Sequence, residues 1–119
     1  SLAVTSISDI VITGYFDQTV DFDPGLPQNN LTSYGSWDIF LLKLDSSGVF
    51  SWVRQFGSLR NDNGQGVSVD QFDNVLLTGF FENSVDFDPS PQFAILTSGG
   101  LVGTVDAFIG KYTSYPLYG

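Results

Sequence analysis

An internal repeat constrains this sequence more than any other feature. Residues 9–25 read DIVITGYFDQTVDFDPG and residues 74–90 read NVLLTGFFENSVDFDPS, so that eight of the seventeen positions are identical at an offset of 65. Residues 31–33 match residues 96–98 at the same offset, and residues 38–40 match residues 106–108 at an offset of 68. A repeat of this length indicates two copies of one supersecondary unit. We therefore divide the chain into a first unit, 1–65, and a second unit, 66–119.

The hydrophobic pattern within each unit predicts short strands and no helix. The helix formers Ala, Glu, Lys and Arg are scarce, and Gly and Pro punctuate runs of Val, Ile, Phe and Thr. We expect four strands in a unit. The first lies around Gly66–Asp70, and the second is Val75–Phe81, an apolar run typical of burial on both faces. The third is Ile39–Leu44 or Ala107–Tyr112, and the fourth is an alternating outer strand, Phe50–Phe56.

The second unit departs from the first at its end. After Lys43 the first unit passes through the turn residues DSSG into its fourth strand, whereas after Lys111 the sequence reads YTSYPLYG without such a turn. We therefore expect seven main strands, with the outer strand of the second unit missing. The chain would then hold about 1.75 repeats.

Several stretches carry a resemblance to a known family. Residues 38–48 (DIFLLKLDSSG), 50–52 (FSW), 66–70 (GVSVD) and 77–79 (LTG) resemble the SBBP-type β-propeller repeat. The inserted VDFDP segment is similar to a variant in large secreted or surface proteins of Bacteroidetes-like bacteria. The resemblance implies an all-β fold of tandem four-stranded β-propeller blades in an exported multi-repeat protein. It brings no catalytic residues with it.

Composition excludes several classes of site. The chain has thirteen acidic and four basic residues, a net charge of −9, and no Cys, His or Met. Disulfides, His-bearing zinc sites and a Ser-His-Asp triad within the chain are therefore excluded. The acidic balance disfavours nucleic acid and anionic membrane surfaces as partners. No apolar run approaches the ~20 residues of a membrane helix.

The doubled VDFDP segment is the best candidate for a metal site. If it is a strand, its two aspartates point to one face and Phe22 or Phe87 points to the other. Hard oxygen ligands suit Ca²⁺ and need no Cys or His. The alternative is structural: the aspartates face water, the phenylalanines face the core and Asp-Pro starts a turn. The candidate ligands are Asp21, Asp23, Asp86 and Asp88, with Asp17 and Glu82 four residues upstream.

Exposed aromatic side chains could provide a sugar-stacking surface. Tyr34 and Trp37 lie in a Tyr-Gly-Ser-Trp loop and are the best candidates, whereas Trp52 lies on an alternating strand and is expected in the core. Trp37 corresponds to Val105 in the second unit, which weakens a repeated lectin site. Three further tyrosines belong to the same candidate surface: Tyr112, Tyr115 and Tyr118. Asp38 and Lys43 could be read as an acid/base pair, but a strand-end or ion-pair role is expected instead.

The sequence thus predicts a non-enzymatic extracellular structural or interaction module. We expect it to be completed by self-association, as a homo-oligomer, or by other blades of a longer protein, because lone repeat units leave edges and faces uncovered. A chain whose open faces have no biological role is the other reading. The alternative functions are a carbohydrate-binding module and part of a carbohydrate-active propeller enzyme whose site lies outside this chain.

Overall fold

The computed structural model describes residues 1–100 and 103–113, and among these every regular element is a β-strand. The first unit forms a four-stranded antiparallel sheet in the order β1-β2-β5-β6. Its strands are β1 (Leu2–Val4), β2 (Ile10–Phe16), β5 (Asp38–Leu44) and β6 (Phe50–Phe56). The four strands expected from the repeat are confirmed, and β6 is the outer one.

The second unit forms a three-stranded antiparallel sheet in the order β11-β8-β7. Its strands are β7 (Asn63–Val69), β8 (Val75–Glu82) and β11 (Val105–Tyr112), so β7 begins ahead of the unit boundary drawn from the sequence. Strand β11 pairs with β8 along its whole length, and no described strand pairs with its other edge. The seven main strands are thus present in the described part of the chain. Residues 114–119, where an outer strand was expected to be missing, lie outside the described residues.

A small hairpin fills the connection between the second and third strands of each unit. The hairpins are β3 (Thr19–Asp21) with β4 (Asn30–Thr32), and β9 (Ser84–Asp86) with β10 (Ile95–Thr97). Each is entered through a tight turn whose residue adopts a positive φ, 58° at Gln18 and 65° at Asn83. The repeat in sequence is therefore a repeat in backbone conformation, including its rare left-handed positions.

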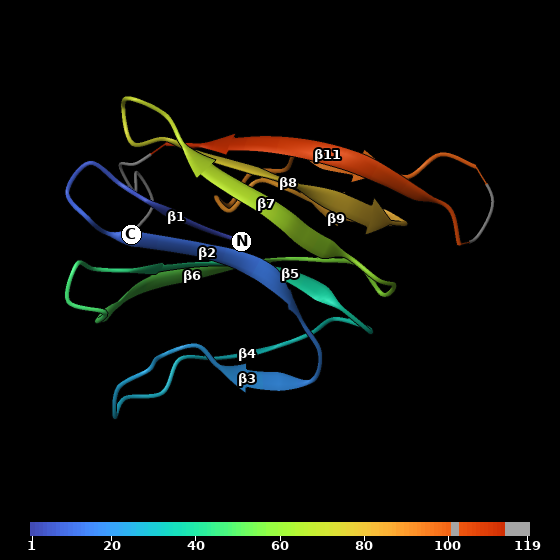
Figure 1. The fold of residues 1–119 in the computed structure, drawn as a ribbon. Coiled ribbons are helices and arrows are strands. Elements are labelled where there is room, and N and C mark those ends of the chain that lie inside the picture. Colours follow the sequence, from blue (N-terminus) through green and yellow to red (C-terminus); the bar gives the residue numbers. More distant parts are fainter. Residues whose placement is uncertain (101–102, 114–119) are drawn as a thin grey trace.

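The described residues form two hydrophobic cores, one on each side of the first sheet, which lies between the β3–β4 hairpin and the second sheet in Figure 1. The β3–β4 hairpin lies on the side of the first sheet that is away from β7, β8 and β11. Phe16, Phe22 and Leu42 are the buried members of the core beneath that hairpin. The larger core lies between the two sheets and includes the second hairpin. Its buried residues are Val11, Ile39, Leu41 and Phe56 from the first sheet, and Val67, Val75, Leu77, Phe81, Val85, Phe87 and Phe108 from the second unit.

The prediction that Val75–Phe81 is buried on both faces is wrong. Val75, Leu77 and Phe81 are buried, but Thr78, which points the other way, is exposed. The physical reason is that no described element covers the far face of the second sheet. Strand β2, its counterpart in the first unit, has a core on each side.

Within the described residues, no helix is long and apolar enough to cross a membrane.

Candidate functional site

The junction of the two units is built around two buried aspartates. Asp38, the first residue of β5, has no exposed surface. Its Oδ2 accepts hydrogen bonds from the Tyr34 amide at 2.8 Å and from the Gln55 side-chain amide at 2.7 Å. Gly57 closes over this carboxylate, because a Cβ there would lie 2.2 Å from Asp38 Cγ. Asp38 therefore ties the loop before β5 to the outer strand β6.

Asp62, in the connection between β6 and β7, is equally buried. Its Oδ2 accepts hydrogen bonds from the Ser58 amide at 2.7 Å and the Ser58 hydroxyl at 2.9 Å, and its Oδ1 accepts one from the Glu82 amide at 3.1 Å. The Ser58 hydroxyl oxygen in turn accepts a hydrogen bond from the Arg60 amide at 3.0 Å. The Asp62 carboxylate thus holds Glu82 of the second unit directly and Arg60 of the connecting loop through Ser58.

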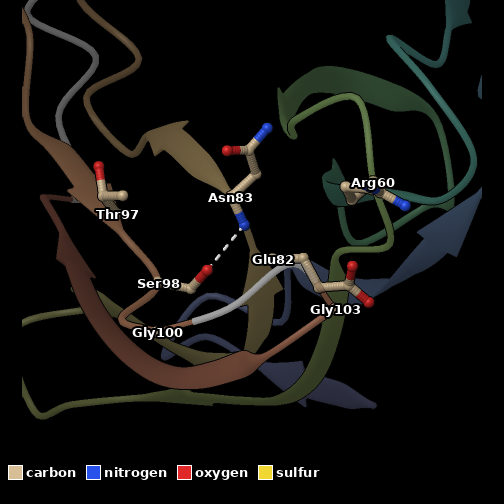
Figure 2. Close-up of a pocket in the computed structure, with 7 residues that line it drawn as sticks. All are labelled: Arg60, Glu82, Asn83, Thr97, Ser98, Gly100 and Gly103. Carbon is tan, nitrogen blue, oxygen red and sulfur yellow. Dashed lines mark hydrogen bonds between the residues drawn. The ribbon is translucent and has the colours of Figure 1, made fainter.

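Arg60 and Glu82 line a polar pocket of about 240 Å³ at this junction (Figure 2). Its other walls come from the turn before β9 and from the segment after β10, where the Asn83 amide donates to the Ser98 hydroxyl at 2.8 Å. The full lining is Arg60, Glu82, Asn83, Thr97, Ser98, Gly100 and Gly103. Such a lining offers hydrogen-bonding groups to a ligand, beside an equal share of apolar surface.

Burial raises the pKa of both junction carboxyls. For Asp38 the loss of water outweighs the hydrogen bonds from Tyr34 and Gln55. For Asp62 the loss of water also dominates over the bonds from Ser58 and Glu82, and the nearby Asp38 charge adds to it. Within the described residues Asp38 Oδ1 accepts no hydrogen bond. A buried carboxylate with an unsatisfied oxygen costs stability. The hydrogen bonds that Asp38 and Asp62 accept nevertheless hold in place the loop before β5 and the connection between β6 and β7.

Only the first two residues of the VDFDP segment, Val20 and Asp21, belong to a strand. Strand β3 ends at Asp21, whose Oδ1 accepts hydrogen bonds from the Asp23 and Asn29 amides, both at 3.0 Å. Asp23 Oδ1 accepts the Gly25 amide at 2.7 Å. Phe22 is buried. The Phe22 amide still donates to the Asn29 carbonyl at 3.0 Å, and the chain bends from Pro24. Short aspartate side chains favour such local bonds to the backbone at a turn. The structural alternative given above describes this geometry.

The second copy of the segment turns in the same way. Asp86 Oδ1 accepts the Asp88 and Ala94 amides at 3.0 and 2.9 Å, and Asp88 Oδ1 accepts the Ser90 amide at 2.8 Å. Hydrogen bonds from Ser90 lower the pKa of Asp88. In the first copy, amide hydrogen bonds from Asn29 and Asp23 lower the pKa of Asp21.

The calcium prediction stays a prediction. Among the described residues no three acidic side chains are grouped so that they could hold a metal ion. Asp17 is exposed on the surface of the first unit, and Glu82 lies at the junction pocket. Calorimetric titration with millimolar Ca²⁺ tests the proposal, which is contradicted if neither heat nor a shift in melting temperature appears.

The aromatic candidates are exposed, as predicted, and the structure adds a third. Tyr34 is 60% exposed, and Trp37 is 36% exposed. Tyr15, which is 48% exposed, contacts Trp37 with the ring centroids 4.5 Å apart and the ring planes tilted by 31°. The sequence did not point to Tyr15, although the β2–β5 pairing that places Phe16 opposite Asp38 brings it beside Trp37. Tyr115 and Tyr118 lie outside the described residues.

The remaining candidates have structural positions. Trp52 packs partly buried against the core between the sheets, as expected, with the Arg54 guanidinium 4.9 Å from its ring centroid. Tyr112 also packs against that core, and its hydroxyl donates to the Phe87 carbonyl at 3.0 Å. Lys43 pairs with Asp9 at 3.4 Å, and Lys111 with Asp70 at 3.4 Å. The ion-pair role expected for Lys43 is confirmed.

Repeated antiparallel sheets that stack face to face through short connections define a β-propeller type of repeat protein. Residues 51–79, which cover β6, β7 and most of β8, match the family model described as SBBP, beta-propeller repeat. This stretch of the chain is thus similar to the SBBP β-propeller repeat.

Comparison with other proteins gave a distant relative. The sequence is 29% identical over 93 residues to an uncharacterized WD repeat-containing protein of Acanthamoeba polyphaga mimivirus, and this match covers 66% of the chain. The matched region is 7% of that protein, so the chain spans a small part of its relative's length. No solved structure matches the chain. The match to the SBBP repeat and the WD repeat-containing relative support a repeat-type interaction module.

Proposed function

We propose that this chain is a non-enzymatic polypeptide-interaction module of an extracellular protein, and that the outer edge of β11 receives a strand of the partner. The supporting observation is the contrast between two equivalent strands. In the first unit β5 lies between β2 and β6, so both of its edges are paired. In the second unit β11 pairs with β8 alone among the described strands.

The first residues of the two strands support the same proposal. Asp106 is the counterpart of Asp38, and its Oδ2 accepts the Gly99 amide at 3.1 Å just as Asp38 accepts the Tyr34 amide. Asp38 is then covered by Gln55 and Gly57, which belong to β6 and the residue after it, whereas Asp106 is exposed. A strand with the pattern of β6 would supply the same amide and the same glycine to Asp106.

The partner that fits is therefore an extended segment with a β6-like sequence. Its main chain would continue the β11 ladder, which is a common mode of recognition between a peptide and a sheet edge. Its glutamine would donate to the Asp106 carboxylate, a charge-assisted bond that fixes the register of the added strand.

A synthetic peptide with the sequence of residues 50–57, FSWVRQFG, tests the proposal. We expect it to bind the chain in fluorescence anisotropy and to slow hydrogen exchange in β11. The same peptide with the Gln55→Ala change should bind at least about tenfold more weakly. A scrambled peptide is the control. Equal binding of all three peptides, or no protection of β11, contradicts the proposal.

The extracellular and non-enzymatic parts of the proposal have separate tests. Protease added to intact cells of the source organism should cleave the chain, and protection until lysis contradicts an extracellular location.

The buried positions of Asp38 and Asp62 support a non-enzymatic role, because these carboxylates already accept main-chain hydrogen bonds. Turnover of a glycoside substrate that is abolished by Asp62→Asn in a still folded protein would contradict it.

Carbohydrate binding is the second candidate, favoured by the exposed pair of Tyr15 and Trp37, whose rings are in contact. Exposed aromatic rings stack on the apolar faces of sugars. Affinity electrophoresis in soluble polysaccharides tests this function. Retardation should be lost in Trp37→Ala and kept in Phe93→Ala, because the Phe93 ring is 78% exposed in the loop between β9 and β10, away from this pair in the sequence. Equal mobility of the two variants in every polysaccharide contradicts it.

A further inference from the structure

We infer that copies of this chain stack head to tail, with the outer face of the second sheet of one copy packed against the hairpin-side face of the first sheet of the next. The inference goes beyond the proposed strand addition at the edge of β11, because it concerns the faces of the two sheets and names a second copy as the partner that covers them. The packing between the two units within one chain is the template for it, since each of its two halves recurs uncovered at the opposite end of the molecule.

The first half of the template is the face of the first sheet that meets the second unit. Ile39 and Leu41 on this face are 0% and 1% exposed. Their counterparts on β11 are Ala107, which is exposed, and Ile109, which is 73% exposed. We call the outer face of the second sheet that carries Ala107 and Ile109 the donor face. It presents aliphatic side chains that no described element covers.

The second half is the face of the second unit that meets the first sheet. Val67, Leu77 and Val85 on this face are 9%, 0% and 0% exposed. Their counterparts at the repeat offset lie on the hairpin side of the first sheet, which we call the acceptor face. They are more exposed at every position: Leu2 is 59% exposed, and Ile12 and Val20 are partly buried.

Strand register makes the uncovered faces geometrically equivalent to the buried ones. Thr13 pairs with Leu41 as Thr78 pairs with Ile109, so the donor face repeats the first half of the template.

The acceptor face shows the same agreement. Leu2 pairs with Ile12 as Val67 pairs with Leu77. The two faces of one molecule are thus complementary to each other and not to themselves. Such an interface is heterologous, and it produces a ring or an open array according to the rotation between copies.

A polar contact between the two units of one chain supports the head-to-tail packing. The Ser6 amide, in the turn between β1 and β2, donates to Asp73 Oδ1 at 2.9 Å in the turn between β7 and β8. At a junction between copies the equivalent positions are Gln71 of one copy and Ser8 of the next, and both are exposed. The Gln71 carboxamide can accept from the Ser8 hydroxyl, so a polar contact is available at this place in the rim.

A mixing experiment tests the inference. Ile109→Glu places a charge on the donor face and Leu2→Glu places one on the acceptor face; both residues are more than half exposed, so the single chains should fold. We expect the wild-type chain to form concentration-dependent species larger than one chain in analytical ultracentrifugation. Each variant alone should stay monomeric, and an equimolar mixture should give a one-to-one dimer, because one intact face remains on each variant. Association of each variant with itself should be weakened by at least about 100-fold.

Leu26→Glu is the matched control. Leu26 is 99% exposed, and its counterpart Pro91 stays exposed at the internal junction, so the control should associate like the wild type. A monomeric wild type, a mixture that stays monomeric, or self-association of either face variant overturns the inference. If the β6 peptide binds β11 and the mixture stays monomeric, the proposed function stands and only the head-to-tail contact is wrong.

Discussion

The Asp62 carboxylate holds the main chain of Glu82 across the junction of the two units, with Asp62 Oδ1 accepting the Glu82 amide at 3.1 Å. The other oxygen of the same carboxylate accepts the amide and the hydroxyl of Ser58, in the loop that leaves β6. A single side chain therefore fastens the connecting loop to the second sheet. Hydrogen bonds of this kind are strong because the acceptor is ionised and the site is dry.

Asp62→Asn should destabilise the chain by about 3 kcal/mol. An asparagine keeps one acceptor oxygen but turns an NH₂ group toward a buried amide donor, which leaves buried N–H groups unsatisfied. Urea unfolding followed by tryptophan fluorescence measures the change. Asp17→Asn, at an exposed position, is the control and should change stability by less than about 0.5 kcal/mol. Equal stability of the two variants contradicts the role given to Asp62.

Gly57→Ala should be poorly tolerated. The added Cβ would lie 2.2 Å from Asp38 Cγ and 2.3 Å from Asp38 Oδ1, and the carboxylate cannot move without losing Tyr34 and Gln55. We expect a loss of about 2–3 kcal/mol in the free energy of unfolding. The control is Gly99→Ala, where the nearest atom is Asp106 Oδ2 at 4.0 Å. A Gly57→Ala variant as stable as the Gly99→Ala variant would show that Asp38 is not enclosed in this way.

The raised pKa values of Asp38 and Asp62 predict a distinctive pH dependence. Burial raises both values in the folded chain above the ordinary 3.8, so the folded state binds protons more tightly than the unfolded state. Stability from these groups is therefore gained as pH falls from neutral through their folded-state pKa values toward 3.8. Asp21 and Asp88, whose pKa values are lowered, work in the opposite direction.

A comparison with Asp38→Asn measures this effect, together with the contribution that the Asp38 charge makes to the raised pKa of Asp62. The wild type should gain stability relative to the variant as pH is lowered from 7 to 4.5, measured by urea unfolding at each pH. A difference between the two proteins that stays constant over this range contradicts a raised pKa at Asp38.

Much of the fold could be predicted from the sequence because its signals are local and doubled. Strands such as Val75–Glu82 and Val105–Tyr112 are long enough to show their pattern, and the repeat assigns the same element twice. The hairpins could not be predicted, since strands of three residues such as Thr19–Asp21 carry no readable alternation.

The junction site could not be predicted because its contacts join residues distant in sequence. Asp38 has a counterpart, Asp106, and a phenylalanine follows each of them two residues later, yet Asp38 is buried and Asp106 is exposed. The difference comes from Gln55 and Gly57 in the next strand and turn. Asp62 has no counterpart at the repeat offset within residues 1–119, so the repeat did not mark it as a candidate. Burial decides the role of each aspartate, and burial is a property of the packed units.

Tyr112→Phe should remove both a hydrogen bond and a late-titrating phenol. The Tyr112 hydroxyl donates to the Phe87 carbonyl at 3.0 Å, and losing it leaves that acceptor less satisfied, at a cost of about 1–2 kcal/mol. Burial raises the pKa of Tyr112 above the ordinary value of 10.0, with the negative charges of Asp88 and Asp86 adding to it. In an alkaline titration followed by phenolate absorbance, the folded wild type should therefore show a step at higher pH than that of the exposed tyrosines. The step should be absent from Tyr112→Phe and still present in Tyr34→Phe, and its presence in both variants would contradict the packing of Tyr112 against the core.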